Sequence, residues 1–546
     1  MLKKMLPNFK SEYFWKLIPV LFFIIFISPV FFILSSLFSE YSENWNHLYN
    51  YVLINYISNS LILIIGVGIL VSIIGVLTSW LVTSFNFKGK KIFEWALILP
   101  LSVPPYILAY TYTSLFDSTG SLNHFINNLF ETNNDQTFFP NIRNVYGAII
   151  VFSFTLYPYV YLISRVAFIN YSKSIIESGR VLGLNRTQAF FKLSIPLIRP
   201  ALIAGLALVI METLSDFGAV EHFAIETFTT GIFRTWYGLY DLKTAMQLAS
   251  FLLIFISIFL FIERASRNKM SYTTENSLYK KSEIETLTGF KNALAFMACF
   301  SPIFMGFLLP VAELINWSIN YKLDFFNHQF LKISTTSILL ALVTAFLCSI
   351  FALIINYSIR YQNNKFLSLL SSSLTLGYAI PGLILAVGIV QLLTFFDSIE
   401  FSNSLNLVLT GSIFGLIFAY IIKSYALSSS TLESSFQRIS FKIDDVSKTL
   451  GNAGWMMLFK VHIPLIKTGF LTSVLLVISE VIKELPATLI LRPFNFDTLA
   501  VSAYIYASEE RMFEAAAPSM AIVLIGLIPI YFLSKIIKES RPGVNL

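Results

Sequence analysis

The chain has 546 residues, of which 56% are hydrophobic and only 13% are charged. Soluble domains average about 25% charged residues, so the composition excludes an ordinary soluble enzyme and indicates an integral membrane protein. The formal net charge of +7 is scattered over short loops, which argues against a nucleic-acid-binding patch. Both cysteines, Cys299 and Cys348, lie in apolar runs and are expected to be core residues rather than a disulfide or a metal site.

Twelve apolar runs follow one another along the chain, each close to the roughly 20 residues that a helix needs to cross a bilayer. They lie at about 17–38, 58–83, 93–116, 146–168, 200–220, 245–262, 293–317, 333–358, 366–395, 406–427, 468–490 and 516–536. The first run follows several lysines, as in a signal peptide, but no small-residue cleavage site follows it, so it is predicted to stay as a span. In lipid these runs must be helical. The predicted fold is therefore an all-α integral membrane protein of about twelve transmembrane helices.

Orientation is predicted from the distribution of Lys and Arg over the loops. Residues 39–57 and 396–405 contain neither. The basic residues gather in the even-numbered loops and their margins, at Lys88, Lys90, Lys91, Arg165, Lys173, Arg180, Arg186, Lys192, Arg199, Arg264, Arg267, Lys269, Lys280 and Lys281. The positive-inside rule places these loops and both termini in the cytoplasm.

An internal repeat divides the chain into two halves. The fourth loop, from Glu177, aligns without a gap with the tenth loop, from Asp445. The identical positions are Leu182, Gly183, Phe191, Lys192, Ile195, Pro196, Leu197 and Ile198, which match Leu450, Gly451, Phe459, Lys460, Ile463, Pro464, Leu465 and Ile466. Apolar composition alone does not supply such matches of Gly, Pro and Lys. The chain is therefore predicted to contain two homologous six-helix halves, 1–265 and 292–546, joined by a cytoplasmic linker, 266–291.

The repeat extends on both sides of these loops. Earlier in each half, Pro104 aligns with Pro381, whereas the first span of each half has no clear counterpart. Later, in the next span, two acids of each half fall at the same positions: Glu212 and Asp216 align with Glu480 and Glu484.

Each repeated loop, 173–199 and 441–467, is predicted to be an elbow of two short helices that meet at Gly183 or Gly451. Glycine permits the left-handed residue that ends a helix. Pro196 or Pro464 is expected to stop the second short helix from running unbroken into the span. Such an elbow would lie along the membrane surface with an exposed tip, and His462 in the second elbow is expected to be exposed. An ordinary amphipathic loop is the alternative.

These elbow sequences resemble the EAA loop of binding-protein-dependent ABC importer permeases. The residues that carry the resemblance are Glu177, Gly183, Ile195 and Pro196 in the first copy and Asp445, Gly451, Ile463 and Pro464 in the second. Neither copy has the family's two alanines, and the second begins with Asp rather than Glu. The resemblance implies that these eight residues dock into a separate cytoplasmic ABC ATPase dimer.

The same resemblance implies the other subunits of the transporter, its location and its substrate. A periplasmic substrate-binding protein would deliver the substrate, and the chain would be a multi-pass protein of the bacterial inner membrane in contact with lipid. ATP would be used by the partner subunit, and no cofactor would be bound by this chain. Within the family, residues 214–239 and 483–500 are similar to ferric-iron permeases. Fused thiamine and phosphonate permeases share the architecture, so these substrates stay open.

The four aligned acids are candidates for the substrate path. Glu212 is expected near the bilayer midplane, with Asp216 one turn further along the same helix face. Acids at a lipid-facing helix centre cost on the order of 3 kcal/mol, so all four are expected to face the bundle interior or a wet cavity. Their oxygens suit a hard cation such as ferric iron. The alternative is structural pairing of Glu480 or Glu484 with Lys483 or Arg492.

Other classes are less compatible with these features. His222, close to Glu221 and Glu226, could touch a metal but is expected to be an interfacial histidine, so the metal ligands stay unknown. An ion-coupled secondary transporter would share duplicated halves and membrane acids, but it does not need two docking loops. A membrane-embedded hydrolase lacks HExxH and GxSxG elements here, and no GxxxxGK[ST] motif predicts ATP hydrolysis by this chain.

Overall fold

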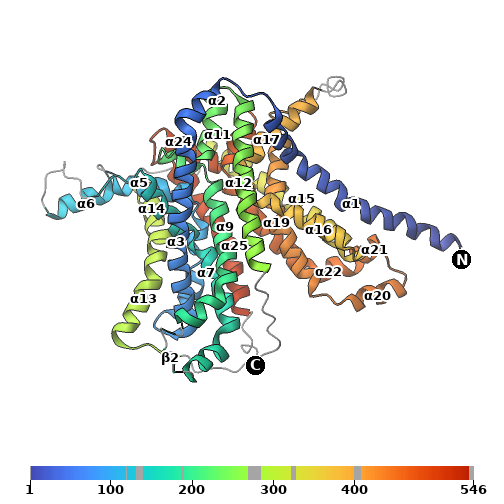
Figure 1. Ribbon diagram of the computed structural model, residues 1–546, viewed down its shortest axis with the longest axis horizontal. Helices are drawn as coiled ribbons and strands as arrows, with labels where there is room; N and C mark the ends of the chain where they lie inside the picture. Colours follow the sequence, from blue (N-terminus) through green and yellow to red (C-terminus); the bar gives the residue numbers. More distant parts are fainter. Residues whose placement is uncertain are drawn as a thin grey trace. The chain divides into compact units, whose positions relative to one another are not determined.

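The computed structural model describes residues 2–117, 120–130, 139–181, 183–185, 188, 190–268, 285–320, 327–398 and 408–539. These residues are almost entirely helical, which confirms the all-α fold class (Figure 1). Most of the predicted linker, namely 269–284, lies outside the described residues, as do positions 182, 186, 187 and 189 of the first elbow. No side chain is described for residues 170–178, which include Glu177.

The helices of the first predicted half are α1 (Leu2–Ser35), α2 (Asn44–His47), α3 (Leu53–Ser84), α4 (Lys90–Ala96), α5 (Pro105–Phe116), α6 (Ser121–Phe130), α7 (Val145–Val181), α9 (Ile195–Ser215), α10 (Gly218–His222), α11 (Phe228–Tyr237) and α12 (Leu242–Asn268). Those of the second are α13 (Gly289–Ile303), α14 (Leu309–Asn320), α15 (His328–Gln362), α16 (Lys365–Leu374), α17 (Gly382–Asp397), α19 (Ile413–Gln437), α20 (Phe441–Thr449), α21 (Trp455–Met457), α22 (Ile463–Ile482), α23 (Pro486–Leu491), α24 (Leu499–Ser508) and α25 (Ala516–Glu539).

Short 3₁₀ and π segments connect several of these helices. The 3₁₀ turns are η1 (Ser36–Phe38), η3 (Leu99–Ser102) and η6 (Thr375–Ala379), and the π turns are η2 (Leu48–Val52), η4 (Phe190–Ser194), η5 (Phe304–Leu308) and η7 (Leu458–His462). The strands β1 (Phe85–Asn86) and β2 (Glu285–Thr286) form a two-residue parallel pair. The N–H of Leu287 donates to the carbonyl of Asn86 at 2.8 Å and extends this pair. The chain that follows the linker is therefore held at the end of α3.

Nine helical segments of the described chain are long and apolar enough to cross a membrane. Two bent pairs raise this number to eleven if each pair is one span. The twelfth predicted run corresponds to α25, whose apolar part, Ala516–Phe532, is shorter than the others. All twelve predicted runs thus coincide with helices, whereas the count of twelve spans stays a prediction.

Both bent pairs turn at the aligned prolines. The chain bends by 90° between α4 and α5 and by 110° between α16 and α17. Val103 and Ile380, the residues before Pro104 and Pro381, are extended, with ψ angles of 106° and 122°. The residue before a proline is disfavoured in the helical region, so the helix ends there. The predicted runs 93–116 and 366–395 are therefore broken helices, and the break repeats with the sequence.

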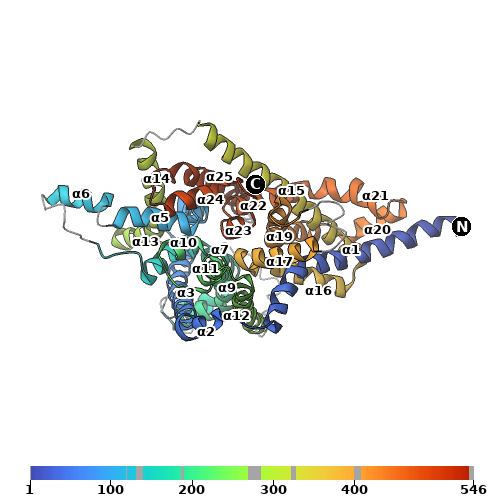
Figure 2. The same cartoon turned by 90° about the horizontal axis from the view of Figure 1, so that it is seen from above.

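The chain forms two compact units that do not coincide with the two sequence halves. One unit contains residues 1–42, 235–250 and 325–502, and the other contains 43–234, 251–324 and 503–546. In the first unit, α1 packs against α15, α16 and α17 (Figures 1 and 2). In the second unit, α14 packs against α5 and α25 (Figure 2). The predicted boundaries 1–265 and 292–546 describe the duplication, and as structural domains they stay a prediction.

Each unit has a core of three helices at corresponding places in the repeat. In one unit α3, α7 and α9 pack together, and an added Cβ at Gly75 would lie 2.8 Å from Val160 Cβ. In the other unit α15, α19 and α22 pack together, and the hydroxyls of Ser349 and Ser473 lie 2.8 Å apart. Small residues allow such close approach of helix backbones.

Candidate functional site

Both elbows turn at a glycine in the left-handed conformation, as predicted. The φ angle is +80° at Gly183 and +82° at Gly451. An added Cβ would meet nothing within 4 Å at either position. The backbone angle, and not crowding, therefore requires glycine at both turns.

The hydrogen bonds at the two turns also correspond. The N–H of Asn452 donates to the carbonyl of Ser447 at 2.9 Å, and the N–H of Leu184 donates to that of Gly179 at 3.0 Å. Each bond closes the chain over the glycine, as in a Schellman motif. The donors of the two bonds are aligned positions of the sequence repeat, and so are the acceptors.

The prolines do not break the second arm of the elbows, contrary to the prediction. The π turns η4 and η7 lead directly into α9 and α22, with Pro196 and Pro464 in the first turn of each helix. Proline is tolerated there because its missing N–H would have no helical partner. Each elbow therefore continues into the following span as one helical segment, Phe190–Ser215 or Trp455–Ile482.

The first arms of the two elbows differ. In the second elbow α19 ends at Gln437, and α20 begins after Ser440, whose side chain accepts the N–H of Lys442. In the first elbow α7 runs without a break for 37 residues to Val181. The predicted pair of short helices is thus wrong for the first half, where the first arm is the end of a long helix.

The second elbow exposes large apolar side chains around its turn. Its predicted docking residue Asp445 is exposed on α20, and Pro464 is exposed at the start of α22. The exposed apolar side chains are Phe441, Ile443, Val446, Leu450, Trp455, Met456 and Phe459. The first elbow exposes Phe191 at the position of Phe459. Apolar groups gathered at one surface typically mark an interaction site.

His462 is buried with 0% exposure, contrary to the prediction of an exposed residue. Its ring lies 5.3 Å from the ring of Tyr357 and 5.6 Å from that of Phe436. Beside it, Asp444 is also buried and forms an ion pair with Arg360. Sequence analysis selected the neighbouring Asp445 and missed this pair, because the partner Arg360 belongs to a helix that is distant in sequence.

In the first half, α9 ends at Ser215, so Asp216 is not on the helix face predicted for it. Its Oδ1 accepts the N–H groups of Ala219 at 2.9 Å and Val220 at 3.3 Å. The hydroxyl of Thr229 donates to the carbonyl of Asp216 at 2.8 Å. Asp216 therefore caps the short helix α10 and joins it to α11. Glu212 lies half-buried in the last turn of α9.

In the second half, Glu484 has the corresponding place after the end of α22. Its Oε1 accepts the N–H of Ala487 at 3.3 Å, and its carbonyl accepts the hydroxyl of Thr488 at 2.6 Å. Its other carboxylate oxygen forms a buried ion pair with Lys423 of α19. Aligned acids thus cap α10 and α23, and each cap follows the break in its span.

The alternative prediction, that the acids of the second half form structural ion pairs, is confirmed in part. Glu480 pairs with Lys483 at 2.9 Å, as that alternative expected. Arg492 pairs instead with Asp497, and Glu484 pairs with Lys423, which was not among the expected partners. A lysine inside an apolar run costs free energy unless it is paired, so Lys423 was the sequence signal for this contact.

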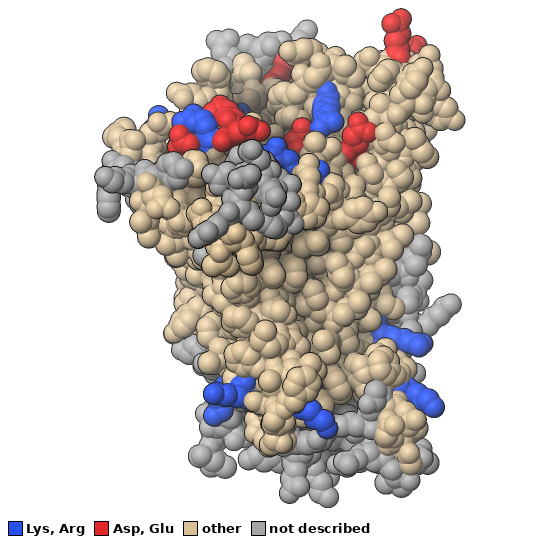
Figure 3. All heavy atoms as spheres, turned by 90° about the vertical axis from the view of Figure 1, so that its left-hand side faces the viewer, with Lys and Arg blue, Asp and Glu red and all other residues tan. Residues whose placement is uncertain are grey.

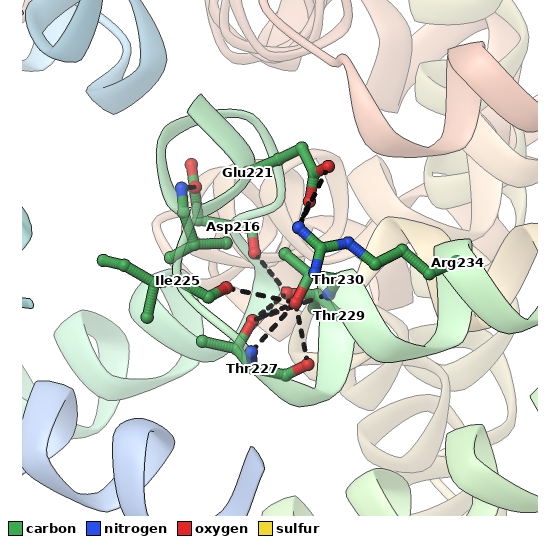
Figure 4. Close-up of polar contacts among 8 residues, drawn as sticks. Asp216, Glu221, Ile225, Thr227, Thr229, Thr230 and Arg234 are labelled. Carbon is green, nitrogen blue, oxygen red and sulfur yellow. Dashed lines mark hydrogen bonds and ion pairs between the residues drawn. The ribbon is translucent and has the colours of Figure 1, made fainter. Parts of the chain in front are cut away.

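The other candidate metal ligands of the first half lie apart. Glu221 pairs with Arg234 at 3.2 Å (Figure 4), and Glu226 accepts the side-chain amide of Asn55 at 2.9 Å. The ring nitrogen of His222 lies 3.0 Å from the hydroxyl of Thr113. No group of three His, Cys, Asp or Glu side chains among the described residues is placed to hold a metal ion.

A small cavity lined by hydroxyl-bearing and apolar side chains lies beside the Asp216 turn. Its lining includes the hydroxyl residues Ser60, Thr213, Thr227 and Thr229. Its volume of about 10 Å³ has room for about one water molecule. The cavity is therefore too small for a hydrated metal ion in this conformation.

Long apolar helices, repeated broken spans and repeated surface elbows define a multi-pass helical membrane protein with an internal duplication. Residues 72–268 match the family model of the binding-protein-dependent transport system inner membrane component. The match covers α7, the first elbow and α9.

Named relatives match along most of the chain. An Fe(3+)-transport system permease protein of Haemophilus influenzae is 26% identical over 486 residues, which cover 88% of this chain and 89% of the relative. A ferric transport system permease protein of Actinobacillus pleuropneumoniae is 22% identical over 509 residues, 90% of this chain and 72% of the relative. A sulfate transport system permease protein of Salmonella typhimurium is 28% identical over 151 residues, only 27% of this chain and 50% of the relative.

Proposed function

We propose that this chain is the membrane-spanning subunit of an ATP-driven importer that moves ferric iron, received from a periplasmic binding protein, into the bacterial cytoplasm. The observation that carries the proposal is the repeated elbow. Two left-handed glycines lie at aligned positions of the repeat, and the helical segments that follow them expose an aligned phenylalanine, Phe191 or Phe459, and continue directly into spans. A single-chain carrier driven by an ion gradient has no use for two such surfaces.

The elbows are the proposed docking sites of an ABC ATPase dimer. Asp445 and Pro464 of the second elbow are exposed, beside apolar side chains such as Leu450 and Phe459. Because each elbow and its span form one helical segment, a displacement of the tip would move the span with it. ATP is used by the partner in this proposal, and this chain binds no cofactor.

The proposed orientation places the elbows and both termini in the cytoplasm. On the face shown in Figure 3, a broad band free of Lys, Arg, Asp and Glu separates two charged ends. Acidic and basic residues both occupy one end, and only basic residues are coloured at the other. This distribution supports the positive-inside assignment. A reporter fusion near Lys280 should give a cytoplasmic signal, and an extracytoplasmic signal would contradict the orientation.

Ferric iron is proposed because the relatives named for ferric transport match most of the chain, whereas the sulfate relative matches about a quarter. Carboxylate oxygens suit a hard trivalent cation. Glu212 is the proposed path residue of the first half. Asp216 and Glu484 also have capping contacts, so variants at these positions must separate a structural role from a role in the path.

Reconstitution with the ATPase and the binding protein tests the function. Proteoliposomes should accumulate radioactive ferric iron only when ATP and both partners are present. Unlabelled thiamine, a phosphonate or sulfate should not compete. Accumulation of thiamine, a phosphonate or sulfate instead of iron would contradict the substrate, and uptake driven by a proton gradient without ATP would contradict the class.

A further inference from the structure

One buried arginine joins the second elbow to a long helix of the same compact unit. Arg360, near the end of α15, donates its Nε to Asp444 Oδ2 at 2.8 Å and its Nη2 to Asp444 Oδ1 at 3.2 Å. The side chains of Arg360 and Asp444 are only 6% and 7% exposed. A bidentate, buried pair of this kind fixes both the distance and the orientation of α20 relative to α15.

The same guanidinium also holds the junction between α19 and α20. Its Nη1 donates to the carbonyl of Phe436 at 2.7 Å, and its Nη2 donates to that of Ile439 at 2.9 Å. Carbonyls at a helix C-terminus have no partner within the helix, so these bonds stabilise the end of α19. Arg360 therefore stabilises the break after which α20 begins.

A second contact from the same turn of α15 reaches the other side of the elbow. The hydroxyl of Tyr357 donates to the carbonyl of Gly454 at 2.7 Å, just before α21. The ring of Trp15, from α1, packs against Tyr357 at 4.8 Å and against Trp455 at 4.7 Å. Both arms of the second elbow are thus fixed to one turn of α15.

Further along, α15 contacts α22, which ends just before the capping acid Glu484, and the start of α24. Ser349 contacts Ser473 of α22, and Ser337 accepts the N–H of Leu499, the first residue of α24, at 2.9 Å. From Arg360 to Ser337 an α-helix spans roughly 35 Å at 1.5 Å per residue. A stiff helix therefore links the elbow to the start of α24.

The first elbow has no equivalent of this ion pair in its sequence. The alignment of the two broken spans through their prolines places Thr83 at the position of Arg360. The gapless alignment of the two elbows places Ile176 at the position of Asp444. The helix α7, which continues without a break to Val181, agrees with this difference.

We infer that the Arg360–Asp444 pair is a coupling element that makes the second elbow and α15 move as one body, so that ATPase motion reaches α24 through α15. The inference rests on the proposed docking of an ATPase to the elbows. It makes Arg360 a positioning residue, since it acts through α20 and touches no substrate. It also makes the two halves unequal, because the aligned positions of the first half, Thr83 and Ile176, cannot form an ion pair.

The test is a double variant, Arg360→Met with Asp444→Leu, assembled with the ATPase and the binding protein. Removing one partner strands a buried charge, whereas replacing a buried pair by apolar residues is often neutral for stability. The double variant should therefore fold, bind the ATPase and keep basal ATP hydrolysis. Iron imported per ATP hydrolysed should fall at least about fivefold, the lower end of typical inter-site couplings.

The matched control is Arg511→Met with Glu514→Leu, which removes an exposed pair whose side chains are 51% and 43% exposed. The control should keep normal coupling. Unchanged iron import per ATP in the Arg360–Asp444 double variant, or loss of its ATPase binding, would overturn the inference. Failure of the unmodified chain to bind the ATPase would instead contradict the proposed function.

A conservative variant tests the coupling role of Arg360 if the double variant does not fold. Arg360→Lys keeps the charge next to Asp444 but cannot bridge the carboxylate and both carbonyls at once. We expect it to fold and to import less iron per ATP than the unmodified chain. Normal import per ATP by Arg360→Lys would overturn the inference.

Discussion

The glycines of the elbows show how a single backbone angle can fix a residue type. Gly183 and Gly451 have φ angles of +80° and +82°, with open space where a Cβ would lie. A β-branched residue in this region costs on the order of 1–3 kcal/mol although it meets no neighbour. The strain would be relieved by moving the elbow tip.

Gly451→Val should therefore lower ATPase co-purification and abolish uptake while the chain still inserts in the membrane. Gly451→Asn should keep most of both, because asparagine tolerates the left-handed region. Gly411→Val is the matched control, since Gly411 has a φ of +75° and equally open space outside the elbows. Equal loss of ATPase binding in the Gly411 and Gly451 variants would show that backbone strain in general, and not the elbow, is responsible.

The buried pair of Lys423 and Glu484 makes a second prediction at this scale. Glu484→Gln keeps an acceptor for the N–H of Ala487 but leaves the buried lysine without its carboxylate. Breaking such a pair costs about 3–5 kcal/mol in soluble proteins. Glu484→Gln should therefore lower the thermal stability, and adding Lys423→Met should restore it.

Uptake by the restored double variant separates the two roles of Glu484. Normal iron uptake per folded molecule would identify Glu484 as structural. Loss of uptake in a variant of normal stability would support a place in the substrate path. A thermal stability of Glu484→Gln equal to that of the unmodified chain would contradict the energetic importance of the pair.

At the scale of elements, the repeated break after α9 and α22 carries the main difference between sequence and structure. The aligned acids were predicted to share one helix face, yet Asp216 and Glu484 lie beyond the helix ends and cap α10 and α23. An apolar run shows where a helix is possible, but the break depends on bonds to N–H groups further along the chain. The elbow turns were predictable because glycine itself indicates the required φ angle.

The capping role of Asp216 predicts that its shape matters more than its charge. Asp216→Asn keeps an oxygen for the N–H groups of Ala219 and Val220, so uptake and stability should stay close to those of the unmodified chain. Asp216→Ala removes the cap and should cost about 1 kcal/mol, with a lower melting temperature. Equal loss of uptake in both variants, with the stability of Asp216→Asn unchanged, would show that the charge serves the cation.

For the whole molecule, sequence analysis found the duplication but not the division into compact units. The first span of each half, which has no counterpart in the repeat, packs against helices of the other half. Thus α1 contacts α15, α16 and α17 of the second half, and α14 contacts α5 of the first half as well as α25 of its own. Apolar helices offer similar surfaces to any neighbour, so composition and repeats do not specify this exchange, in which the first span of each half packs against the other half. The specifying contacts, such as the packing of Trp15 on Tyr357, join residues that are distant in sequence.

This exchange predicts that neither half is stable by itself. A chain of residues 1–265 would lack α13, α14 and α25, and α1 would expose the surface that packs against α15 and α17. A chain of residues 292–546 would lack α1 beside α15 and would leave α14 without α5. Each half expressed alone should therefore be degraded or aggregate, whereas the two halves expressed together should co-purify and restore iron uptake.

Substituting Trp15 by Ala should weaken the co-purification of the two halves, because this side chain is fully buried between α1 and the second half. Two halves that accumulate separately as stable proteins would contradict the exchange and support independent domains at the sequence boundaries.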